Sequence, residues 1–123
     1  MAEIIAREPI RSFAQFWPYY LREHSRPMTR ALHFVGSSGG LVFLATAVLR
    51  RSWSLAIAAP VCGYALAWFG HFFVEKNRPA TFRHPIWSFA ADWRMWRLMA
   101  TGQLQRELQR LNLAEMNDVP AER

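Results

Sequence analysis

The sequence has one cysteine, and two long segments in its middle part carry no charge. Because Cys62 stands alone, an internal disulfide and a zinc site built from thiolates are both excluded. Residues 31–49 and 53–74 contain no Asp, Glu, Lys or Arg. Residues 1–11 lack an apolar run that resembles a signal peptide, so we expect the first apolar segment to act as its own insertion signal.

The two uncharged segments are each about 20 residues long, which is the length an α-helix needs to cross the hydrocarbon core of a bilayer. Only Arg50, Arg51 and Ser52 separate them. The sequence therefore predicts an all-α fold, an integral membrane helical hairpin with two spans, in one domain over residues 1–123 with its core at 12–100. A small soluble helical bundle with an apolar central pair is the alternative.

Basic residues lie mainly outside the two segments. Of the 15 Lys and Arg residues, only Arg50 and Arg51 lie in the turn, so the positive-inside tendency predicts that both termini are cytoplasmic. The membrane would be a bacterial inner membrane, or the endoplasmic reticulum in a eukaryote. Topology accounts for most of the net charge of +6, so we expect membrane lipid and no nucleic acid as a partner.

The flanking segments are aromatic or amphipathic. Residues 12–23 and 86–99 are rich in Trp, Tyr and Phe, with charges between them in the second, which is typical of helices in the membrane interface. A polar helix is expected at about 103–112. Its Leu104, Leu108 and Leu111 recur at helical spacing and could either mediate a homodimer or rest on the membrane or on the protein's own domain.

The four histidines lie at the outer ends of the two apolar segments. His33 precedes Arg51 by about 18 residues and His71 follows it by about 20, which in helices is roughly 27 and 30 Å from the turn. Both histidines also end a stripe of small residues, which allows helices to approach closely in lipid. We therefore expect His33 and His71 to face each other, with His24 and His84 converging from the flanking segments.

Histidine at membrane depth is costly unless it is paired, which makes it a candidate functional residue. Glu75 follows His71 by one helical turn and could bind a metal directly or hold the imidazole. Histidines with a carboxylate suit Fe(II), Mn(II) or Zn(II). The candidate catalytic residues and metal ligands are His24, His33, His71 and Glu75, with His84 as a further candidate ligand.

Two stretches carry a resemblance to a known family: HSRPMTRALHFVG, and after the hairpin GYALAWFGHFFVEKNRPATFRHPIWSFAADWRMW. Across residues 13–96 the chain resembles small membrane proteins related to the yeast 2-hydroxy fatty acid dioxygenase. The resemblance implies an Fe(II)-dependent enzyme of fatty acid α-oxidation, with His24, His33 and His71 matching the family's histidines. His84 lies in a loop beyond the shared core.

On this reading the substrates are a 2-hydroxy fatty acid and dioxygen, and the product is one carbon shorter. The acyl tail would lie among the apolar helices, where Tyr64 and Trp68 are candidates to line its pocket. The candidates to hold the substrate carboxylate, or alternatively lipid phosphate, are Arg26, Arg30, Lys76, Arg78 and Arg83. Two alternatives stay open: a haem-binding electron carrier with His33 and His71 as axial ligands, and a membrane protein without catalysis.

Overall fold

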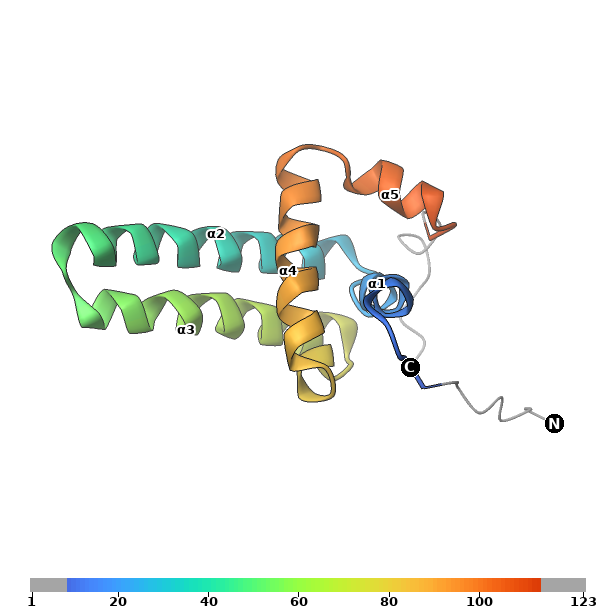
Figure 1. Cartoon of the computed structure of the whole chain (residues 1–123), viewed down its shortest axis with the longest axis horizontal. Coiled ribbons are helices and arrows are strands. Elements are labelled where there is room, and N and C mark those ends of the chain that lie inside the picture. Colours follow the sequence, from blue (N-terminus) through green and yellow to red (C-terminus); the bar gives the residue numbers. More distant parts are fainter. Residues whose placement is uncertain (1–8, 114–123) are drawn as a thin grey trace.

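A computed structural model describes residues 9–113, and these residues form helices and connecting loops with no strand. Figure 1 shows their arrangement. The elements in chain order are α1 (Phe13–Arg22), α2 (Pro27–Arg50), α3 (Trp53–Phe69), the π-helix η1 (Gly70–Glu75), the short 3₁₀ helix η2 (Ala80–Phe82), α4 (Pro85–Ala100) and α5 (Leu104–Arg110). The expected all-α fold is confirmed.

The predicted hairpin is formed by α2 and α3, which run side by side from a tight turn (Figure 1). Arg51 ends α2 in the left-handed conformation, and the Ser52 hydroxyl accepts a hydrogen bond from the Leu55 N–H at the start of α3. The small-residue stripes face each other as expected. A Cβ atom placed on Gly36 would lie 3.1 Å from the Gly63 carbonyl oxygen, so glycine is required for this approach.

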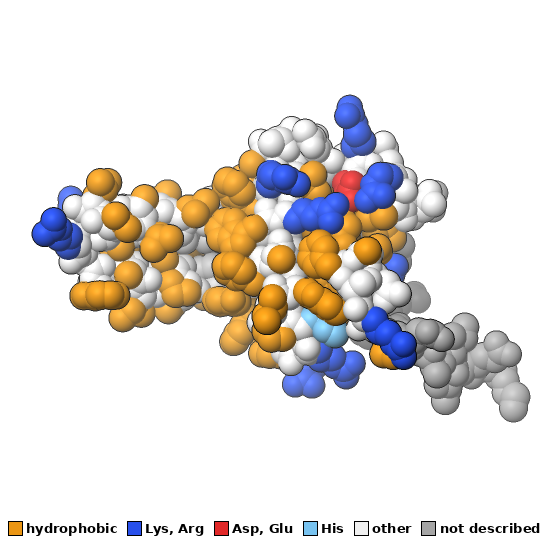
Figure 2. Space-filling model, in the orientation of Figure 1, with side chains coloured by type: hydrophobic (Ala, Val, Ile, Leu, Met, Phe, Trp, Pro, Cys, Tyr) orange, Lys and Arg blue, Asp and Glu red, His pale blue; other side chains and the backbone are white. Residues whose placement is uncertain are grey.

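Hydrophobic side chains are spread along the face of the hairpin that Figure 2 shows, and the other helices leave this part of the hairpin uncovered. Within Pro27–Arg50 and Trp53–Glu75, windows of 18 residues reach mean hydropathies of 1.7 and 1.5, and only 17% and 22% of these windows is buried within the protein. Both segments are long and apolar enough to cross a membrane. Helix α2 begins four residues before the uncharged segment 31–49. Pro27 can start the helix, because the N–H groups of the first helical turn have no partner within the helix and the one that proline lacks costs nothing.

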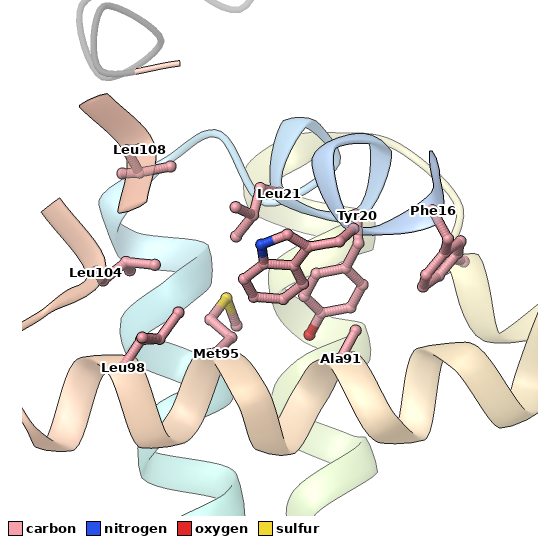
Figure 3. Close-up of a cluster of buried hydrophobic side chains, with 10 residues drawn as sticks. Phe16, Tyr20, Leu21, Ala91, Met95, Leu98, Leu104 and Leu108 are labelled. Atoms are coloured by element: carbon pink, nitrogen blue, oxygen red, sulfur yellow. The ribbon is translucent and has the colours of Figure 1, made fainter. Parts of the chain in front are cut away.

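The other helices gather at the open end of the hairpin, where α4 runs across both long helices (Figure 1). A core of buried side chains joins α1, α4 and α5 (Figure 3). It includes Leu104 and Leu108, which pack on the protein's own core, as in the second of the two interpretations of this stripe. In Figure 3, Tyr20 extends from α1 toward α4, a direction that matters for the site described next.

Candidate metal centre

Three of the four histidines meet at the open end of the hairpin. His24 follows α1, His33 lies in the second turn of α2, and His71 lies in η1. The Nε2 atoms of His24 and His33 are 3.0 Å apart, and those of His33 and His71 are 3.4 Å apart. Their exposed fractions are 1%, 7% and 2%. The structure therefore brings His24, His33 and His71 together, three of the four histidines that we expect to converge.

The opposite nitrogen of each ring faces an oxygen atom. Nδ1 of His24 is 2.7 Å from the Tyr20 carbonyl oxygen, and Nδ1 of His71 is 2.7 Å from the Asn77 side-chain oxygen. Nδ1 of His33 is 3.7 Å from a carboxylate oxygen of Asp92. Because an oxygen acceptor at hydrogen-bond distance requires a donor, the protons of neutral His24 and His71 belong on Nδ1, and a proton on Nδ1 of His33 would face the Asp92 carboxylate. With the protons placed in this way, the three Nε2 lone pairs face one another.

The orientation of Asn77 follows from its other contacts. Its amide nitrogen donates to the backbone carbonyl and the carboxylate of Glu23, at 2.9 and 2.7 Å, so its oxygen must face His71. Lys76 turns the chain in the left-handed conformation after η1, and the Asn77 N–H bonds back to the His71 carbonyl. A tight turn thus places the amide beside the imidazole that it orients.

Three lone pairs that point at one another repel unless a cation lies between them. Burial is the main reason that the pKa of His24 is well below its usual value, and the neighbouring His33 and His71 lower it further. Neutral imidazole is the form that binds metal ions. The donor set therefore fits a metal ion held by three Nε2 atoms, with each ring fixed from behind by a hydrogen-bond acceptor or a carboxylate.

Two adjoining cavities meet at these histidines. A groove of about 250 Å³ runs along the hairpin between α2, α3 and α4, and its lining is mostly apolar. A small cavity of about 10 Å³ has His24, His33 and His71 in its wall. Both cavities are lined by His33, Tyr64, Ala67 and Asp92. An apolar channel therefore ends at a cluster of metal-binding nitrogens.

A family model described as "2-hydroxy-palmitic acid dioxygenase Mpo1-like" matches residues 10–104, a range that contains the three clustered histidines. The chain belongs to the Mpo1-like family. No curated protein and no solved structure matches the chain. The matched range covers the hairpin, the three histidines, Asn77 and Asp92.

Two of the predicted ligands of this Mpo1-like protein do not lie in the cluster. The Glu75 carboxylate accepts hydrogen bonds from the Ser25 hydroxyl, at 2.8 Å, and from the Arg26 N–H at the start of α2. His84 packs its ring on Trp87 and Phe16, with 5.3 Å between the ring centres in each pair. The structure thus places Glu75 as an anchor of the loop that carries His24, and His84 against aromatic side chains of α1 and α4.

The hydrogen bonds of Glu75 account for its position outside the cluster. Glu75 follows His71 by four residues within the π-helix η1, a spacing that predicts a shared face. Its carboxylate is nevertheless directed to the Ser25 hydroxyl and the Arg26 N–H. π-Helical turns of this kind are frequent at functional sites.

The basic candidates have different positions. Arg30 is buried, and its guanidinium donates to the carbonyl oxygens of His24 and Ser25, each at 2.9 Å. This contact holds the loop that carries the first histidine. Lys76 and Arg78 are exposed at the same end of the hairpin, with the Arg78 guanidinium over the Phe82 ring.

The sequence interpretation did not single out four residues that surround the cluster: Tyr20, Asn77, Ser88 and Asp92. The Tyr20 hydroxyl donates to Asp92, and burial raises the pKa of Asp92 to about 7 and that of Tyr20 well above its usual value. One feature of the sequence distinguishes Asp92 as a candidate site residue: it is the one acidic residue in the aromatic segment 86–99. In the sequence alone, a charge in this segment indicates an interfacial helix.

The geometry also bears on the haem alternative. The Nε2 atoms of His33 and His71 are 3.4 Å apart, with His24 beside them. Axial ligands of a haem lie on opposite faces of the macrocycle, which must fit between the two imidazoles. Three imidazoles in mutual contact leave no space for that plane.

Proposed function

We propose that this chain is an Fe(II)-dependent dioxygenase that shortens 2-hydroxy fatty acids by one carbon, with His24, His33 and His71 as the iron ligands. One observation carries the proposal: three inward-facing Nε2 atoms lie at the head of an apolar groove. The description of the Mpo1-like family supports the substrate class. Glu75 and His84 have other partners, and we propose that neither is a ligand.

The donor set suits iron. Imidazole nitrogen binds Fe, Zn, Cu and Ni, and a ligand set with open positions is the arrangement that non-haem oxygenases use. Bound Fe(II) would supply the open coordination positions at which substrate oxygen atoms and dioxygen meet. The protein's task is to keep the three rings neutral and oriented, which the Tyr20 carbonyl, Asn77 and Asp92 perform.

The conversion is balanced for one molecule each of substrate and dioxygen. The bond between C1 and C2 breaks, C2 becomes the carboxyl carbon of the shorter acid, and C1 leaves as carbon dioxide. Dioxygen is the oxidant, and one molecule of water is formed. The groove holds the acyl tail, with Tyr64 in its wall, and excludes water from the head of the substrate.

We further propose that α2 and α3 cross the membrane, with both termini on the cytoplasmic side. The support is the uncovered apolar surface of the hairpin and the separation of basic residues, since the turn carries only Arg50 and Arg51. The histidine cluster then lies near the cytoplasmic boundary. Arg26, Lys76 and Arg78 remain our candidates for contact with the substrate carboxylate, or with lipid phosphate.

The test is anaerobic reconstitution of the purified protein with Fe(II), followed by oxygen and 2-hydroxypalmitate, with product chain length measured by mass spectrometry. The proposal predicts pentadecanoic acid from the wild type and none from His71→Ala. His84→Ala is the matched histidine control and should retain the product. Absence of a shortened acid with every 2-hydroxy acid tested would overturn the assignment.

A further inference from the structure

The small cavity beside the histidines has polar walls. Besides His24, His33 and His71, it is lined by Tyr20, Ser88 and Asp92. Its volume of about 10 Å³ is close to the space that one water-sized group needs. A single polar group of a ligand could therefore occupy it, beside the metal site and at the end of the apolar groove.

Ser88 has an unused hydroxyl in this cavity wall. Its side chain is 1% exposed, and within residues 9–113 the hydroxyl oxygen has no hydrogen-bond partner. A buried hydroxyl without a partner is costly, and in native structures such a group usually bonds to another group, a water or a ligand. A polar group that enters the cavity could therefore form a hydrogen bond with the Ser88 hydroxyl.

Asp92 follows Ser88 by one turn of α4, so the two side chains share a face of the helix. One carboxylate oxygen of Asp92 accepts from the Tyr20 hydroxyl and lies 3.7 Å from His33 Nδ1. Asp92 lines both the groove and the small cavity, whereas Ser88 lines only the small cavity. The pair thus marks the junction where an acyl tail would meet the histidine cluster.

We propose that Ser88 and Asp92 recognise the 2-hydroxyl group of the substrate and so select 2-hydroxy acids over unsubstituted fatty acids. This inference rests on the proposed function. With the head of the acid at the histidines and its tail in the groove, the second carbon lies at the junction. There the Ser88 hydroxyl donates to the oxygen of the 2-hydroxyl, and the Asp92 carboxylate accepts its proton in a hydrogen bond.

The selectivity follows from the cost of unpaired polar groups. A site whose buried polar groups face a substrate hydroxyl rejects the analogue that lacks it, because these groups then stay without partners. An unsubstituted acid would offer no partner to the Ser88 hydroxyl, which has none within residues 9–113. The 2-hydroxy acid would accept a hydrogen bond from the Ser88 hydroxyl.

The experiment measures the affinities of 2-hydroxypalmitate and palmitate for Fe(II)-loaded protein in detergent under anaerobic conditions, by displacement of a fluorescent fatty acid. We expect the wild type to bind 2-hydroxypalmitate more tightly. Ser88→Ala should reduce this ratio about five-fold, as expected for one hydrogen bond, while palmitate affinity stays the same. Asp92→Asn should also reduce the ratio of the affinity for 2-hydroxypalmitate to that for palmitate.

Thr29→Val is the matched control. The Thr29 hydroxyl is the other buried hydroxyl without a partner within residues 9–113, and Thr29 lines neither cavity. This variant should keep the wild-type ratio. The melting temperature of ligand-free Ser88→Ala should equal or exceed that of the wild type, since an unpaired buried group is removed.

The outcomes separate the two proposals. If the wild type prefers 2-hydroxypalmitate and shortens it, but Ser88→Ala keeps the full preference, the recognition role of Ser88 and Asp92 is wrong and the enzymatic assignment stands. If the wild type binds both acids equally and shortens neither, the proposed function itself is wrong.

Discussion

Removal of the Asn77 side chain should weaken metal binding although Asn77 is not a ligand. Asn77→Ala deletes the acceptor 2.7 Å from His71 Nδ1, and with it the two bonds from the amide to Glu23. The imidazole is then free to rotate, and its proton is no longer confined to Nδ1. Loss of such a partner typically costs 10- to 100-fold in metal affinity, which is about 1.4 to 2.7 kcal/mol.

The assay is a titration of the metal-free protein in detergent with Co(II), followed by the visible spectrum of the bound ion. Gln105→Ala is the matched control, because Gln105 is an exposed amide side chain on α5. It should bind Co(II) as the wild type does. Both variants are compared at a temperature where circular dichroism shows that each is folded.

Two results would contradict this reasoning. Unchanged Co(II) affinity in Asn77→Ala would mean that the orientation of His71 does not depend on this amide. An equal loss in Gln105→Ala would mean that the assay reports general destabilisation and not the contact between Asn77 and His71.

Three further predictions concern stability. Gly36→Ala should lower the free energy of unfolding by about 1–3 kcal/mol, because its Cβ would lie 3.1 Å from the Gly63 carbonyl, whereas Gly63→Ala, with its nearest atom at 3.7 Å, should be tolerated in thermal unfolding. Glu75→Ala should cost about 1–3 kcal/mol by leaving the Arg26 N–H without its acceptor, and should still bind one metal ion in a titration, which a ligand variant would not. A hydrogen bond from Arg110 is the main reason that the pKa of Glu107 falls to about 2, below its ordinary value of 4.5. The ionised carboxylate therefore stabilises the fold above about pH 4.5, and melting temperatures between pH 5 and pH 2 should fall more steeply in the wild type than in Glu107→Gln.

The hairpin and the meeting of two histidines could be predicted because both depend on spacing along regular helices. Uncharged segments of about 20 residues set the helix lengths, and the distances of His33 and His71 from the turn set their depth. The glycines then indicated which faces meet, and Gly36 does face Gly63. These inferences needed no knowledge of the other helices.

The remainder of the site depends on features that spacing does not encode. The Glu75 carboxylate is held by Ser25 and the Arg26 N–H, about 50 residues away in the sequence, and the spacing of His71 and Glu75 does not encode that contact. The position of Asp92 depends on how α4 crosses the hairpin, which is a matter of tertiary packing (Figure 1). His84 lies at the start of α4, before Pro85, and its ring packs on Phe16 of α1. This contact also depends on tertiary packing, so the spacing of the histidines does not predict it.

The most direct test of the central claim is the iron content of the protein after anaerobic loading with Fe(II) and removal of unbound metal. The account predicts one iron per chain in the wild type and in His84→Ala, and none in His24→Ala, His33→Ala or His71→Ala. Full iron content after loss of any of these three histidines, or a loss of iron in His84→Ala, would contradict it.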